Sequence, residues 1–120
     1  DDMYDMRMML ANSLKKYRYR VIMAENGQEA LKLIDHYKPD LIISDIVMPE
    51  LDGFEFLEQL QESSILSDIP VIMLSGLNKS QDRIRCLELG AKDYFAKPFN
   101  PAELLLKANR LIKESQMYGF

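Results

Sequence analysis

The sequence predicts a doubly wound α/β domain, in which a parallel sheet is covered by helices on both faces. Short, continuously apolar runs alternate along the chain with segments whose apolar residues recur at helical spacing. Strands that alternate with helices are joined by crossover connections, which make the sheet parallel and bury its strands. The length of 120 residues fits one compact domain.

The elements follow one another in a regular order. An amphipathic helix is expected over residues 6–17. Three short apolar runs then predict strands at 21–24, 41–44 and 71–74, and a last short strand is expected over 93–96. Helical spacing over 30–37 predicts one helix, and residues 54–60 begin another that serines 63, 64 and 67 bring to an end. Ile84 and Leu87 belong to the next helix, and the apolar stripe of the last runs over 104–112. Gly90 is expected to end its helix as a left-handed cap, and Asn100-Pro101 carries the start signals of the last helix.

Composition narrows the function classes. With 48% hydrophobic and 28% charged residues, the chain reads as a soluble globular domain, and no apolar run approaches the ~20 residues of a membrane span. The formal charge of −4 argues against nucleic acid as a direct ligand. The lone Cys86 cannot form an intrachain disulfide, and no signal-peptide pattern is present, so we expect a cytoplasmic protein. We expect a single domain over 1–120, of which 114–120 could begin a linker.

Polar residues follow the ends of the predicted strands. Asp45 ends one strand, Ser75 ends the next, Lys97 follows the last, and Asp1 and Asp2 stand before the first helix. In sheets of this kind, ligands bind beyond the carboxyl ends of the strands, at the point where the strand order reverses. These five groups are therefore expected to converge on one edge of the sheet.

The three carboxylates in this group favour a metal ion. Clustered carboxylates repel one another unless a cation joins them, which implies a divalent metal at Asp1, Asp2 and Asp45. Oxygen-only ligands with room for water and phosphate suit Mg²⁺ better than zinc or copper.

The order and spacing of these residues resemble the receiver domain of two-component response regulators, including the single-domain chemotaxis regulator. The resemblance covers essentially the whole chain. It rests on the acidic pair, the segment DIVMPELDG around Asp45, a hydroxyl residue 30 positions after Asp45 and the lysine of AKPF 52 positions after it. ENGQEAL and GAKDY support it. The resemblance implies a flavodoxin-like, five-stranded sheet of order 2-1-3-4-5.

The resemblance also implies the chemistry of the site. Asp45 would attack a phosphoryl group and become an acyl phosphate. Asp2 and Asp45 would bind Mg²⁺ directly, Asp1 mainly through water, and Val47 through its backbone carbonyl. Because the transferring phosphoryl group spreads charge over its oxygens, positioning and neutralisation are the protein's task.

Three further residues complete the implied switch. Lys97 would pair with one phosphoryl oxygen, and the Ser75 hydroxyl would donate to another. On phosphorylation Ser75 would move toward the phosphoryl group and Tyr94 would rotate inward into the vacated space. A cis peptide before Pro98 would aim the lysine.

The implied function is a phosphorylation-dependent signalling switch that takes its phosphoryl group from a sensor histidine kinase, a phosphotransfer protein or a small phosphodonor. The protein would catalyse only its own phosphotransfer and dephosphorylation. Its output would pass through the last strand and the flanking segments 79–89 and 101–113, to an output domain, a downstream protein or a second copy. We expect no direct nucleic-acid or membrane contact. Val47 and Leu77, both apolar, predict slow self-dephosphorylation.

Two alternatives come from other classes of protein. A pseudo-receiver would keep the fold as a phosphorylation-independent binding module, but the acids and Lys97 are intact. A phosphatase of the haloacid dehalogenase kind would need an acid two residues after the nucleophile, where this chain has Val47. The receiver is therefore preferred.

One feature departs from the family. A receiver has an apolar strand before its acidic pair, whereas this chain begins at Asp1. In the order 2-1-3-4-5 that strand is central. Either the chain is truncated, or a neighbouring molecule supplies the strand, or the sheet is rearranged, and we expect truncation. The metal role of Asp1 and Asp2 is accordingly less secure than that of Asp45.

Overall fold

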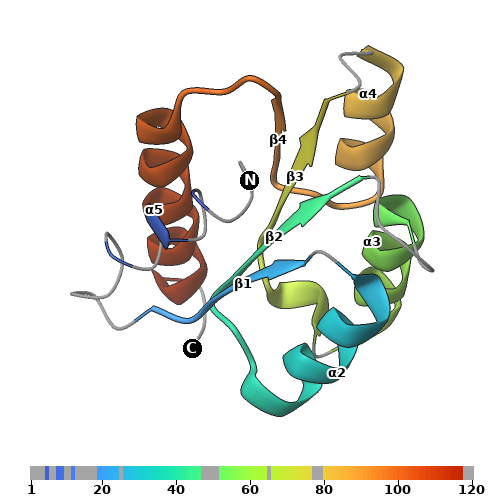
Figure 1. The fold of residues 1–120 in the computed structure, drawn as a ribbon. Helices are drawn as coiled ribbons and strands as arrows, with labels where there is room; N and C mark the ends of the chain where they lie inside the picture. The colour runs from blue at the N-terminus through green and yellow to red at the C-terminus, as the bar shows by residue number, and fades with distance from the viewer. Residues whose placement is uncertain are drawn as a thin grey trace.

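The fold is an α/β arrangement in which helices lie on both faces of a single sheet (Figure 1). It comes from a computed structural model. The residues that the structure describes are 5, 8, 9, 12, 19–24, 26–46, 52–64, 66–76 and 80–117.

Four parallel strands form the sheet, in the order β1-β2-β3-β4. They are β1 (Val21–Ala24), β2 (Leu41–Asp45), β3 (Val71–Ser75) and β4 (Asp93–Ala96). All four predicted strands are confirmed, and β2 and β3 each extend by one residue to include Asp45 and Ser75. The first four residues of β2 and all of β3 are buried, as their continuous apolar runs predict for central strands of a parallel sheet.

The register brings the carboxyl ends of three strands to the same level. Asp45 at the end of β2 pairs with Leu74, and Ser75 at the end of β3 pairs with Ala96 at the end of β4. The residue after β4 is Lys97. The sheet therefore delivers Asp45, Ser75 and Lys97 to one edge, as predicted.

The β1 and β2 strands pair directly, with Val21 opposite Leu41 and Ala24 opposite Ser44. In the order 2-1-3-4-5 a further strand would separate these two, and removing it leaves the order that the described strands have. Among the described residues, β1 and β2 are hydrogen-bonded neighbours with no strand between them. This order of the described strands is compatible with each of the three alternatives, and the expectation of truncation stays a prediction.

Four α-helices are described, together with one short 3-10 helix. They are α2 (Gly27–Tyr37), α3 (Gly53–Glu62), α4 (Ser80–Glu88), α5 (Pro101–Met117) and the 3-10 helix η2 (Leu66–Asp68). The α5 helix covers one face of the sheet, while α2, α3 and α4 lie on the other (Figure 1). The helix expected over 6–17 falls mostly outside the described residues.

The helices begin and end where local signals in the sequence predict. The Asn26 side chain accepts hydrogen bonds from the backbone of Gln28 and Glu29, so Asn26-Gly27 starts α2 three residues earlier than the apolar pattern alone indicates. Asn100 caps α5 through the amide of Ala102, as expected. Gly90 has a φ of 105°, which confirms its left-handed conformation after α4.

Alternation along β2 divides the core between the two faces. Ile43 packs with Leu104 of α5 in one cluster, whereas Ile42 packs with Leu57 of α3 in the other. Both clusters consist of buried hydrophobic side chains, and the cluster on the side of α2, α3 and α4 also contains aromatic ones, so the sheet lies between two apolar layers. Within the described part of the chain, no helix has the length and apolar character needed to cross a bilayer.

Candidate functional site

The site centres on Asp45, which is the last residue of β2. The residues before it are fully buried, but the Asp45 side chain is 18% exposed. The carboxylate thus sits at the boundary between an apolar core and solvent, where an external cation or phosphodonor can reach it. This exposure meets the first requirement of the predicted chemistry.

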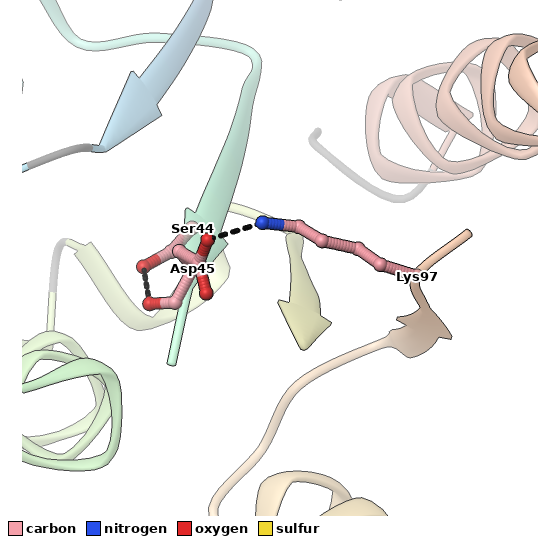
Figure 2. Close-up of polar contacts among 3 residues, drawn as sticks. All are labelled: Ser44, Asp45 and Lys97. Atoms are coloured by element: carbon pink, nitrogen blue, oxygen red, sulfur yellow. Dashed lines mark hydrogen bonds and ion pairs between the residues drawn. The ribbon is translucent and has the colours of Figure 1, made fainter. Parts of the chain in front are cut away.

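The ammonium group of Lys97 lies beside this carboxylate. Lys97 Nζ donates to Asp45 Oδ2 at 2.6 Å, although the two residues are 52 positions apart (Figure 2). The backbone of Lys97 is held as well, because its amide donates to the carbonyl of Ser75 at 2.7 Å. The Lys97–Pro98 peptide is cis, as expected. The predicted meeting of an acid and a lysine is therefore present.

Ser75 and Tyr94, the expected switch pair, both lie inside the protein. Ser75 is 1% exposed and Tyr94 is 8% exposed. Tyr94 packs in the cluster on the α2, α3 and α4 side of the sheet. The tyrosine therefore occupies an inward position in this structure, whereas the resemblance implies that it moves inward on phosphorylation. Whether it moves at all stays a prediction.

Asp93, which precedes Tyr94, connects the last strand to α5. One of its carboxylate oxygens accepts from the Tyr94 amide at 2.7 Å, and the other lies 3.4 Å from Lys107 Nζ. A single side chain therefore contacts both the backbone of the tyrosine and the C-terminal helix. Sequence reading did not identify this pair, because nothing local to GAKDY indicates which lysine of the last helix it meets.

The backbone around Asp45 is also tightly packed. The Gly53 amide donates to the carbonyl of Ile46 at 2.6 Å, and a Cβ built on Gly53 would lie 2.5 Å from the carbonyl oxygen of Asp45. On the other side, the hydroxyl of Ser44 donates to the same carbonyl at 3.0 Å (Figure 2). Sequence reading missed both contacts, although a serine within an apolar run and a glycine after DIVMPELD are signals that could have drawn attention to them.

The predicted metal ligands are described only in part. Asp1, Asp2 and Val47, and Leu77 of the predicted hydrolysis path, lie outside the described residues. No group of three potential metal ligands occurs among the residues that the structure describes. The Asp45 carboxylate fits Mg²⁺ in type and in access, since it offers oxygen at a partly exposed position.

Comparisons with known proteins agree with this geometry. The family model of the response regulator receiver domain matches residues 1–109. A probable transcriptional regulator ycf27 of Guillardia theta is 39% identical over 120 residues, which are all of this chain and 46% of that protein. This chain thus spans about half the length of that relative.

Solved structures show the same fold. The receiver domain of the Francisella response regulator 1452 has a TM-score of 0.79 and 34% identity, with 96% of this chain and 93% of that chain covered. The receiver domain of a sensor histidine kinase from Pseudomonas aeruginosa PAO1, solved with a magnesium ion in its active site cleft, has a TM-score of 0.72 and 30% identity, with 89% and 88% covered. The match over nine-tenths of the chain and the meeting of Asp45 with Lys97 lead to one conclusion: the chain belongs to the response regulator receiver domain family of two-component signalling.

Proposed function

We propose that this protein is a phosphorylation-dependent switch whose phosphoacceptor is Asp45. The observation that carries the proposal is the 2.6 Å contact between Lys97 Nζ and Asp45 Oδ2 at the carboxyl edge of the sheet. A partly exposed carboxylate with an ammonium group beside it combines a nucleophile with a positive charge that can stabilise an incoming phosphoryl group.

The reaction is a phosphoryl transfer to a carboxylate. An oxygen of Asp45 forms a bond to phosphorus while the bond from phosphorus to the donor's leaving group breaks, and the leaving group departs with the electron pair. Lys97 then exchanges part of its contact with Asp45 for a contact with a phosphoryl oxygen, because it is a flexible point charge already at the site. The Ser75 hydroxyl donates to a second phosphoryl oxygen.

Mg²⁺ is the cofactor we propose for this step. Asp45 would hold it together with Asp2, with Asp1 through water and with the backbone carbonyl of Val47. When bound, Mg²⁺ supplies positive charge that offsets the repulsion between the carboxylate and the phosphoryl group. Support comes from the oxygen chemistry of Asp45 and from the magnesium ion in the related Pseudomonas domain.

Phosphorylation adds about 1.5 to 2 negative charges at the end of β2. We infer that Ser75 and Tyr94 transmit this change to β4 and its flanking helices. Tyr94 is buried in this structure. We therefore infer that phosphorylation draws the surrounding residues closer to Ser75 and restricts the positions that the Tyr94 ring can take. We propose that the protein catalyses only its own phosphotransfer and self-dephosphorylation.

The proposed output surface consists of β4, α4 and α5. Three large apolar side chains are exposed on the two helices: Ile84 at 54%, Leu87 at 41% and Leu106 at 61%. Exposed apolar groups on helices that flank the switch strand favour a protein partner at this face. We propose that this face binds a second copy or an output domain. A sensor histidine kinase or phosphotransfer protein would supply the phosphoryl group. The domain itself would contact no nucleic acid.

Intact mass spectrometry tests the phosphoacceptor. The protein is incubated with acetyl phosphate and Mg²⁺, and the same is done with Asp45→Asn and with Asp68→Asn, an exposed acid on η2 as the matched control. We expect one added phosphoryl group in the wild type and in Asp68→Asn, and none in Asp45→Asn or after Mg²⁺ is removed. A wild-type protein that adds none would instead favour the pseudo-receiver.

A further inference from the structure

Ser44 is an unusual residue for its place in the sheet. It is 0% exposed and precedes Asp45 in a strand whose other buried residues are aliphatic. Ile42, two residues earlier on the same face, packs in the apolar cluster beneath α2 and α3. A buried hydroxyl is unfavourable unless it is hydrogen-bonded, so its partner indicates what the residue does.

Ser44 donates a hydrogen bond to the backbone of the proposed phosphoacceptor. Ser44 Oγ donates to the carbonyl oxygen of Asp45 at 3.0 Å, while Lys97 Nζ holds the side chain of the same residue (Figure 2). The β1 strand ends at Ala24, which pairs with Ser44, so Asp45 lies one residue beyond the last pair of the β1–β2 ladder. At this point the side chain of Ser44 contacts a carbonyl that lies past the end of that ladder.

Gly53 lies close to the same carbonyl group of Asp45. A Cβ on Gly53 would lie 2.5 Å from the Asp45 carbonyl oxygen and 2.6 Å from Ile46 Cα, so the chain passes this peptide at a distance that only glycine permits. The Ile46 amide is held in turn by the Leu74 carbonyl at 3.0 Å. Two hydrogen bonds therefore hold the peptide that follows Asp45, one from Ser44 and one to Leu74, and Gly53 leaves little space beside it.

We propose that Ser44 is a positioning residue for phosphoryl transfer, which acts by fixing the peptide of Asp45 and thereby the direction of its carboxylate. The proposal rests on the proposed phosphoacceptor role of Asp45. The orientation of a carboxylate relative to phosphorus and to Lys97 depends on the backbone from which it projects, and reaction rates respond strongly to small changes in such geometry. Ser44 itself contacts neither the phosphoryl group nor its donor.

The test separates positioning from stability. The maximal rate of acyl-phosphate formation and the apparent KM for acetyl phosphate are measured at saturating Mg²⁺ in the wild type, Ser44→Ala, Ser44→Thr and Ile42→Val, and each thermal midpoint is recorded. Ile42→Val is the matched control because it removes a buried group from the same face of β2 and leaves the hydroxyl of Ser44 in place. Should Ser44→Ala not fold, Ser44→Cys replaces it, since a thiol keeps the shape but donates weakly.

We expect Ser44→Ala to lower the maximal rate by about two- to tenfold, the factor that corresponds to one ordinary hydrogen bond, with KM unchanged. Ser44→Thr restores at least half of the rate because it keeps the hydroxyl, and Ile42→Val keeps the wild-type rate. A Ser44→Ala rate equal to the wild type, or an equal loss in Ile42→Val at a similar thermal midpoint, overturns the proposal. A wild type that accepts no phosphoryl group overturns the function proposed above, and this inference with it.

Discussion

The close approach of Gly53 to the phosphoacceptor strand predicts that Gly53→Ala destabilises the protein. The added Cβ would lie 2.5 Å from the Asp45 carbonyl oxygen, which is 0.9 Å short of the 3.4 Å where ordinary contact begins, and 2.6 Å from Ile46 Cα. Both neighbours are backbone atoms, so no side-chain rotation relieves the clash. The peptide that carries Asp45 must move.

The magnitude follows from two opposing effects. Overpacking of this kind costs about 1–3 kcal/mol, and alanine in place of glycine returns up to about 1 kcal/mol through helix preference, because Gly53 opens α3. We expect a net loss of about 1–2 kcal/mol. For a chain of this length, that loss lowers the thermal midpoint by roughly 3–10 °C.

Gly76→Ala is the matched control for this experiment. Gly76 follows Ser75 at the end of the neighbouring strand, and a Cβ there meets nothing within 4 Å. We expect its thermal midpoint to stay within about 2 °C of the wild type, since surface substitutions usually change stability by less than 0.5 kcal/mol. Circular dichroism melts of the three proteins give the comparison. A Gly53→Ala midpoint at or above that of Gly76→Ala would refute the reasoning.

Three more predictions concern stability elsewhere in the fold. Asn26→Ala removes the cap of α2 and should cost about 1 kcal/mol in urea unfolding, whereas Asn26→Asp should cost little, and equal values for both would contradict the cap. Burial raises the pKa of Cys86 from 9.0 to about 11, so the folded state favours the neutral thiol. The stability that this gives below pH 9 should fall as the pH rises toward 11. In thermal melts repeated from pH 8 to 11, Cys86→Ala should lose that dependence. The Arg85 guanidinium lies 4.0 Å from the centre of the Phe54 ring, so Arg85→Ala should cost about 0.5–1 kcal/mol in the same denaturation assay and Arg85→Lys less; identical costs would argue against a cation–π contact.

Much of the fold could be predicted from the sequence because the strands are encoded locally. The runs ending at Asp45 and Ser75 are apolar without interruption at their centres, as central parallel strands must be, and all four strands were found. The meeting of Asp45 with Lys97 followed from a rule about where parallel strands end. Neither inference needed the path of any loop.

Contacts that depend on packing could not be predicted in this way. The direct pairing of β1 with β2 depends on which strands are available to pair with each of them, and hydrophobic periodicity within one strand does not indicate its neighbours. The inward position of Tyr94 depends on the rotamer of its side chain, which the register of the strand does not determine. The close approach of Gly53 to the Asp45 carbonyl is a distance that no spacing rule supplies.

The most direct test of the central claim locates the phosphoryl group on the chain. Protein treated with acetyl phosphate and Mg²⁺ is reduced with borohydride, which converts an aspartyl phosphate to homoserine, and the digested peptides are sequenced by mass spectrometry. We expect homoserine at position 45 and at no other acid, with the signal absent from Asp45→Asn. Homoserine at a different aspartate, or an unchanged Asp45 in protein that has gained a phosphoryl group, would contradict the assignment of Asp45 as the phosphoacceptor.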